Sequence, residues 1–155
     1  MASRRNQIEM TSSEVDEFLA TGHTLNVATI SPSGHPHLVA MWYAMLDGKP
    51  TFWTFGKSQK IMNVRRDPRI TCLVETGTSY SELRGVEMVG TARIIDDVEQ
   101  IVRIGAAVAE KHGGPAAATG PALEFIRNQA VKRLGVVVDV EKVVSWDHSK
   151  LGGGY

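Results

Sequence analysis

The chain alternates between segments whose apolar residues recur every second position and segments where they recur every three to four positions. The first pattern is typical of strands and the second of amphipathic helices. Six segments have the strand pattern and end at Gly, Pro, Asp or Ser. They cover residues 25–30, 38–46, 51–55, 70–75, 86–95 and 136–140, the last of which can extend to Trp146. The first three are joined by turns too short for parallel crossovers, so we expect antiparallel pairing.

Helices are predicted before and between these strands, and three of them follow a residue that can cap the first turn. Thr11 stands three residues before Glu14 in a capping-box pattern, Ser58 precedes the second helix, and Asp96-Asp97 opens the third. The predicted helices cover about residues 12–22, 58–66, 97–113 and 122–134, and residues 113–121 form a loop. The sequence therefore predicts a mainly β fold with peripheral helices, a six-stranded antiparallel split β-barrel.

Length, charge and cysteine content narrow the class of protein. A chain of 155 residues is expected to form a single domain, with residues 1–10 as a loose N-terminal arm and residues 152–155 as a frayed tail. Seventeen basic residues balance seventeen acidic ones, which disfavours nucleic acid as a partner. The single cysteine excludes an intrachain disulfide, and no apolar run approaches the ~20 residues of a membrane span. We expect a soluble cytoplasmic protein.

Positive charge is concentrated between residues 57 and 69, which carry five basic side chains and one acidic one. If Ser58 caps a helix, its hydroxyl, the free backbone N–H groups of the first turn, Lys57 and Lys60 converge where the helix dipole favours an anion. A phosphate fits there. The preceding strand, residues 52–55, is aromatic, so a flat ring could lie along the sheet. The alternative is a solvated basic helix without a ligand.

Several motifs in this order resemble one known family. They are Pro36-His37 followed by residues 38–43, the Asp47-Gly48 turn, Phe52-Trp53-Thr54, the run Lys57-Ser58-Gln59-Lys60 with Asn63, and Arg66-Asp67-Pro68-Arg69. The chain from Leu25 to Leu151 is similar to the pyridoxamine-phosphate-oxidase-like, FMN-binding split-barrel superfamily. Within it, the ending Val143 to His148 most resembles the deazaflavin-dependent oxidoreductases that use coenzyme F420.

The resemblance implies where a cofactor would bind. The ring would lie against the strand 38–43, held mainly by backbone groups, and the phosphate would contact the run that begins at Ser58. The neutral Gln59 stands where flavin-using relatives often have a base, and Arg65, Arg66 and Arg69 could face the acidic tail of F420. Members of the family are dimers with the site at the interface, so Trp146 or Arg84 could act in the partner's site. The implied cofactor-binding residues are Val39, Ala40, Met41, Trp53, Thr54, Lys57, Ser58, Gln59, Lys60, Asn63, Arg66 and Trp146.

The implied function is an oxidoreductase in which reduced F420 transfers hydride to a small organic acceptor, such as an unsaturated carbonyl, a quinone or a tetrapyrrole. No catalytic residue is assigned, although Tyr80 or His37 could donate a proton. The alternatives are an FMN-dependent oxidoreductase of the same fold and a non-catalytic protein that binds a cofactor or haem. His35 and His37 lack a third metal ligand, so no metal site is expected. Cys72 lies in an apolar strand and is expected to be buried and inert.

Overall fold

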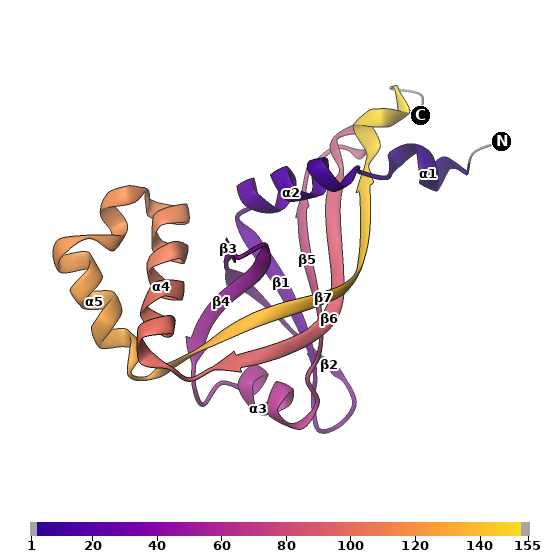
Figure 1. The fold of residues 1–155 in the computed structure, drawn as a ribbon. Coiled ribbons are helices and arrows are strands. Elements are labelled where there is room, and N and C mark those ends of the chain that lie inside the picture. The colour runs from indigo at the N-terminus through magenta and orange to yellow at the C-terminus, as the bar shows by residue number, and fades with distance from the viewer. Residues whose placement is uncertain (1–2, 153–155) are drawn as a thin grey trace.

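The strands form one antiparallel sheet that curls into a half-barrel (Figure 1). The structure is a computed structural model that describes residues 3–152. The strands in this range are β1 (Thr24–Ile30), β2 (Pro36–Trp42), β3 (Ala44–Leu46), β4 (Lys49–Phe55), β5 (Arg69–Thr76), β6 (Arg84–Ile95) and β7 (Arg133–Asp147). Their order in the sheet is β2-β1-β5-β6-β7-β4-β3. The mainly β, antiparallel fold is confirmed, and β7 runs past Trp146 as the sequence allowed.

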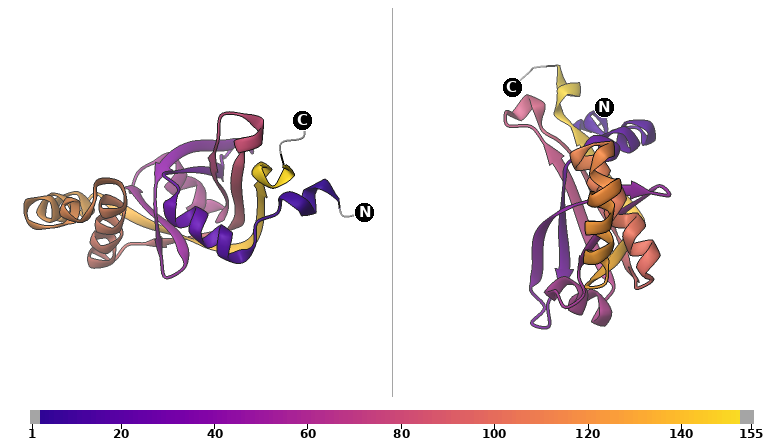
Figure 2. Two further views of the ribbon diagram at one scale, coloured as in Figure 1. Left: turned by 90° about the horizontal axis from the view of Figure 1, so that it is seen from above. Right: turned by 90° about the vertical axis from the view of Figure 1, so that its left-hand side faces the viewer.

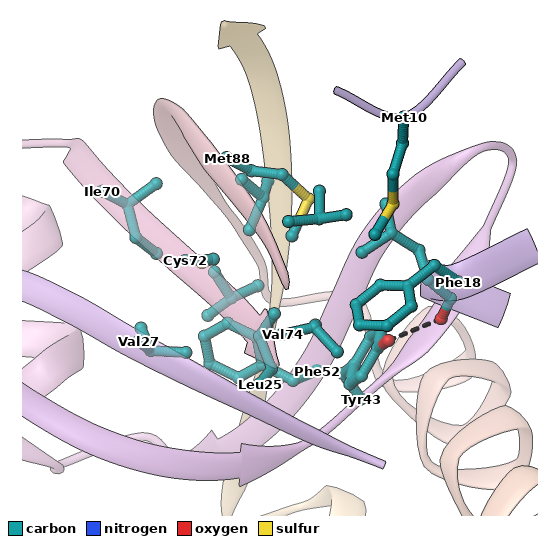
Figure 3. Close-up of a cluster of buried hydrophobic side chains, with 14 of the residues drawn as sticks. Met10, Phe18, Leu25, Val27, Tyr43, Phe52, Ile70, Cys72, Val74 and Met88 are labelled. Carbon is teal, nitrogen blue, oxygen red and sulfur yellow. Dashed lines mark hydrogen bonds between the residues drawn. The ribbon is translucent and has the colours of Figure 1, made fainter. Parts of the chain in front are cut away.

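The prediction of six strands is wrong, because the expected strand 38–46 divides at Tyr43 into β2 and β3. β2 pairs with β1, whereas β3 pairs with β4 at the other end of the strand order. The two edges of the sheet are therefore joined through a single residue, which brings the edges round toward each other. Tyr43 is fully buried at this break, and its hydroxyl donates a hydrogen bond to the Leu19 carbonyl oxygen at 2.5 Å (Figure 3).

The inner face of the curled sheet encloses the main hydrophobic core. Alternate residues of each strand point inward, such as Leu25 and Val27 on β1 and Phe52 on β4 (Figure 3). Cys72 on β5 lies within this cluster and is fully buried, and burial raises the pKa of its thiol to about 12. The expected burial is confirmed, and the raised pKa disfavours the thiolate, which is the reactive form.

The helices lie around the barrel: α2 (Ser12–Thr21) at one end, α3 (Gln59–Arg66) at the other, and α4 (Val98–Gly113) with α5 (Gly120–Ala130) to one side (Figures 1 and 2). A second core joins α4 and α5 to the sheet through Ile101, Ile126 and the partly buried Trp53. The predicted helix 122–134 is too long at its C-terminus. Arg133 and Leu134 instead begin β7, because they pair with Phe55 and Thr54 of β4.

The N-terminal segment, expected as a loose arm, contains a short helix, α1 (Arg4–Ile8), capped by Ser3. The residues after it are bound to the C-terminal part of the chain. The Met10 backbone N–H donates to Ser145 Oγ at 3.0 Å, and Lys150 donates to the Glu9 carbonyl at 2.9 Å and pairs with Glu14 at 2.7 Å. These contacts join distant parts of the sequence, so local pattern could not indicate them. Of the predicted frayed tail, residues 153–155 lie outside the described residues.

Candidate functional site

Helix α3 follows β4 directly and is fixed against β1 by its inward face. Ile61 and Val64 are buried in the barrel end. The amide of Asn63 is fully buried: its Nδ2 donates to Thr29 Oγ1 on β1 at 3.0 Å, and its Oδ1 accepts from Gln59 Nε2 at 2.8 Å. A buried amide satisfied on both sides holds the helix in one place. Asn63 thus connects α3 to the sheet, and Gln59 supports Asn63 from within the helix.

Three polar side chains meet where β4 ends and α3 begins. Lys60 Nζ donates to Thr54 Oγ1 at 3.0 Å, and Thr54 Oγ1 lies 3.5 Å from Ser58 Oγ. Ser58 occupies the N-cap position of α3, as predicted, but its hydroxyl makes no capping bond to the helix backbone. We call Thr54, Ser58 and Lys60 the α3 cluster. The sequence placed all three in the site, and the structure brings them together.

The charge of the α3 cluster is not balanced by an acid. In the described part of the chain, Lys60 has no carboxylate within ion-pair distance, and its one side-chain partner is the neutral hydroxyl of Thr54. Partial burial lowers the pKa of Lys60, because desolvation disfavours the ammonium form. The N-terminal end of α3 adds the partial positive charge of its dipole. An anion placed here would stabilise both charges.

Strand β2 has an open edge. It lies at the end of the strand order and pairs with β1 alone among the described strands. Val39 and Met41 pack inward, whereas Ala40 lies on the outer face between the exposed Leu38 and Trp42. Backbone groups on the unpaired edge are available to a ligand. The predicted ring-binding segment, residues 39–41, begins two residues after His37 on the same strand. At roughly 3.3 Å per residue, this is about 7 Å along β2.

His37 supplies an observation that the sequence did not. Its register partner is Thr29, the residue bound to Asn63, so its ring lies near the α3 end of the hairpin. The Nδ1 atom of His37 is buried and has no hydrogen-bond partner among the described residues. A buried nitrogen without a partner is costly and marks a place where a bound molecule can satisfy it.

Other predicted residues point elsewhere. Trp53 lies on the opposite face of β4 from Thr54 and packs against the second core. Arg66 donates to the Ile30 carbonyl, and Arg69 forms an ion pair with Asp67 at 2.6 Å. That pairing lowers the pKa of Asp67 to about 2. Arg66 and Arg69 are therefore engaged in contacts within the chain.

Trp146 lies far from the α3 cluster of its own chain. It is near the end of β7, thirteen residues beyond Arg133, which at about 3.3 Å per residue is roughly 40 Å of strand. Trp146 covers Gly85, where an added Cβ would come within 2.2 Å of the indole. Arg84 pairs with Asp147 at 3.1 Å, and Tyr80 packs on His148 at the same end of the molecule. Trp146, Arg84 and Tyr80 therefore do not reach α3 of their own chain.

A second basic surface lies on the outer face of β4, and the sequence indicated only two of its cations, Lys57 and Arg65. Four cations, Lys57, Arg65, Lys132 and Arg133, line an open groove of about 610 Å³ together with Phe55 and Val131. We call it the basic groove. It depends on the pairing of Phe55 with Arg133, two residues far apart in sequence. Local sequence therefore could not show that Lys132 and Arg133 lie beside Lys57 and Arg65.

No helix within residues 3–152 is both long and apolar enough to cross a bilayer. No group of three His, Cys, Asp or Glu side chains in the same range is placed to hold a metal ion.

Comparisons with known proteins agree with this architecture. The family model of pyridoxamine 5'-phosphate oxidase matches residues 11–147. The crystal structure of a conserved hypothetical protein from Mycobacterium tuberculosis is 41% identical, with a TM-score of 0.91 over 97% of this chain and 93% of that chain. No curated protein matches in sequence.

Two more distant structures share the fold alone. One, an F420 reductase, is 23% identical, with a TM-score of 0.63 over 83% of this chain and 94% of that chain. The other, the haem storage protein of Vibrio cholerae, is 13% identical, with a TM-score of 0.67 over 89% and 97%. The split-barrel fold thus accommodates more than one kind of ligand.

Proposed function

The chain belongs to the pyridoxamine 5'-phosphate oxidase family, and on that premise we propose that it is an oxidoreductase that uses reduced coenzyme F420 to transfer hydride to a small organic acceptor. The α3 cluster carries the proposal. A partly buried ammonium whose side-chain partner is a neutral hydroxyl, at the start of a helix, suits the phosphate of such a cofactor.

The phosphate would be held by Lys60, by the hydroxyls of Thr54 and Ser58, and by the first turn of α3. Lys57 adds a charge beside them. Asn63 and Gln59, whose side chains bind each other, position the helix instead of facing the ligand. This division explains why a run of adjacent residues can include both ligand-binding and structural side chains.

The ring would lie along the open edge of β2 at Val39, Ala40 and Met41. Two of these side chains are committed to the core, so recognition there falls to backbone groups. When bound, the reduced deazaflavin supplies the hydride. The protein's residues hold the phosphate, orient the ring and exclude water. His37, with its unpartnered nitrogen on the same strand, is our candidate donor of the accompanying proton.

We propose F420 in preference to FMN because positive charge extends past the single-phosphate site. Lys57 and Arg65 are exposed cations without ion pairs in the described chain, whereas the neutral Gln59 stands within the phosphate run. A ligand with further acidic groups would use these cations, but FMN has one phosphate. A haem storage protein has the same fold, so the charge of the site and not the fold carries this preference.

We further propose a homodimer with the cofactor site at its interface. The outer face of β2 presents Leu38 and Trp42, which are 66% and 61% exposed. Helices α4 and α5 lie to one side of the barrel (Figure 2), and the indole of Trp42 stacks on the His112 ring of α4 with ring centres 4.5 Å apart. Exposed apolar residues in a row favour burial against a second copy. Trp146 would then reach the partner's site.

The test is a set of titrations of the purified protein with F420, FMN and haemin, followed by fluorescence or absorbance. We expect F420 to bind more tightly than FMN, and reduced F420 to be oxidised in the presence of an acceptor from a panel of enones, quinones and tetrapyrroles. Tight binding of FMN without binding of F420 would establish the FMN-dependent alternative. Binding of haemin alone would make the protein a non-catalytic haem binder.

A further inference from the structure

Strands β1 and β5 separate from each other at the end of the barrel that carries α2. Their pairing stops at Asn26 and Leu73. Beyond this point β1 continues to Thr24 against β2, and β5 continues to Thr76 against β6. Both strands therefore stay regular while they are no longer paired with each other, so the opening is not a frayed end. We call this opening the β1–β5 cleft.

A cavity of about 350 Å³ fills the β1–β5 cleft. Its walls are the end of α2 with the start of β1 on one side, and the end of β5 with the start of β6 on the other. The lining is largely polar and includes the side chains of His23, Thr24, Glu75, Thr76 and Arg84. Pockets for small molecules start at about 300 Å³, so the cleft suits a compact polar ligand.

Arg84 is positioned in the cleft but is not saturated with hydrogen bonds. Its guanidinium carbon lies 5.2 Å from the Phe18 ring centre, and its Nε lies 3.1 Å from Asp147 Oδ2. This ion pair is not aligned as a hydrogen bond, and the Nε atom is buried without a hydrogen-bond partner among the described residues. A guanidinium held in this way suits a carboxylate, because its planar fork can donate two parallel hydrogen bonds.

The charges around the cavity favour a ligand with one negative group. Glu75 lines the same cavity, and within residues 3–152 no ion pair joins it to Arg84. A ligand with several acidic groups would be repelled by this carboxylate. The hydroxyls of Thr24 and Thr76 can donate to a carbonyl oxygen. The lining thus suits a small molecule that carries one carboxylate and a carbonyl group.

The cleft borders the predicted ring-binding segment on the side away from the α3 cluster. Asn26, which lines the cleft, is the register partner of Ala40, and such opposed residues have Cα atoms about 4.5–5.5 Å apart. Thr29, which binds Asn63 of α3, lies five residues beyond Thr24, roughly 17 Å along β1. The proposed phosphate site, the ring-binding segment and the cleft therefore follow one another along β1.

We propose that the β1–β5 cleft binds a small carboxylate through Arg84, and that this ligand is the hydride acceptor, an enone with one carboxylate. The second part rests on the proposed function, whereas the first part does not. In the reaction the alkene gains a hydride from reduced F420 and a proton, and it becomes saturated. The cofactor is oxidised by two electrons and releases a proton. The carboxylate itself is unchanged and serves for recognition.

Binding without any cofactor tests the cleft. The probes are 4-oxopentanoate and its uncharged methyl ester, titrated by calorimetry into the wild type and Arg84→Gln. The matched control is Arg93→Gln, because Arg93 is also on β6 and also pairs through Nε with an aspartate, Asp139, at 3.2 Å. We expect the wild type and the control to bind the acid about tenfold or more tightly than the ester, and Arg84→Gln to lose this preference.

A second variant covers the case in which Arg84→Gln does not fold, since it removes the partner of the buried Asp147. Thr76→Phe fills the cleft from the exposed end of β5 and leaves that ion pair in place. It should weaken the binding of acid and ester alike, and thermal denaturation shows whether each variant is folded. Equal binding of acid and ester by the wild type overturns the inference. Wild-type binding of the acid by a folded Arg84→Gln or Thr76→Phe protein does so as well.

Steady-state kinetics with reduced F420 test whether the ligand is the acceptor. The substrates are 4-oxo-2-pentenoate and its methyl ester. We expect Arg84→Gln to raise the KM of the acid about tenfold or more, with kcat and the KM of the ester within about twofold of the wild type. An unchanged KM for the acid removes the acceptor assignment. If F420 does not bind or is not oxidised, the proposed function fails, and the binding of 4-oxopentanoate alone decides the cleft.

Discussion

Replacement of Lys60 by alanine is the sharpest test of where the cofactor phosphate binds. The substitution removes an ammonium that lies 3.0 Å from Thr54 Oγ1 and has no carboxylate partner in the described chain. A hydrogen bond to a charged group contributes about 1.5–3 kcal/mol. Since about 1.4 kcal/mol corresponds to a tenfold change in Kd, we expect F420 to bind roughly ten- to a hundredfold more weakly.

The same substitution should have little effect on the stability of the free protein. Burial lowers the pKa of Lys60, so the ammonium is less favourable in the folded state than in the unfolded chain. That cost is present at neutral pH and is relieved as the pH rises toward the unfolded value. Alanine removes the cost together with the hydrogen bond to Thr54, which contributes about 1 kcal/mol. The two effects oppose each other, so the free energy of unfolding should change by less than about 1 kcal/mol.

Fluorescence titration and thermal denaturation measure both quantities in the same samples. The control is Lys49→Ala, which removes a partly exposed lysine already paired with Asp139 on the other side of the sheet. The control should keep the wild-type affinity. A folded Lys60→Ala protein with unchanged affinity for the cofactor would refute the reasoning, because the α3 cluster would then be an inert surface charge.

Three further changes probe the frame around the site. Asn63→Leu should lower the free energy of unfolding by about 1–3 kcal/mol in denaturant titrations, because the hydroxyl of Thr29 loses its buried donor. Burial lowers the pKa of Lys111 to about 8, so the charged ammonium destabilises the folded protein below that pH. The free energy of unfolding of the wild type, relative to that of Lys111→Met, should therefore rise between about pH 8 and 10. Leu38→Arg on the outer face of β2 should convert the proposed dimer to a monomer by light scattering; a dimer unchanged at micromolar concentration would exclude that face as the interface.

The sequence predicts the β architecture well because each strand has a local alternating pattern. It fails at Tyr43, whose apolar neighbours on both sides continue the strand pattern. The break is visible only in the pairing, since β2 hydrogen-bonds to β1 and β3 to β4. A local pattern shows which residues are apolar but not which strand a segment pairs with. That is why the predicted strand count is six while the sheet has seven strands.

The α3 cluster could be predicted because its members lie within seven consecutive residues, from Thr54 to Lys60. A turn and a helix start bring such residues together whatever the rest of the chain does. The groove residues Lys132 and Arg133 could not be predicted, because β7 brings them beside Phe55 through long-range pairing. The same limit explains why Trp146, on the same strand, lies too far along β7 to reach the cluster in its own chain.

The turn between β4 and α3 explains how a chain without net charge can hold a strongly anionic ligand. Residues of β4 alternate between the two faces of the sheet, so Thr54 points to the α3 cluster and Phe55 to the basic groove. The bond from the Gly56 N–H to the Lys132 carbonyl fixes this turn to β7. Movement of the turn would therefore displace cations on both faces together. Surface charges farther apart than about 8–10 Å are screened, so two local sites can be positive while acids elsewhere on the chain make the whole molecule neutral.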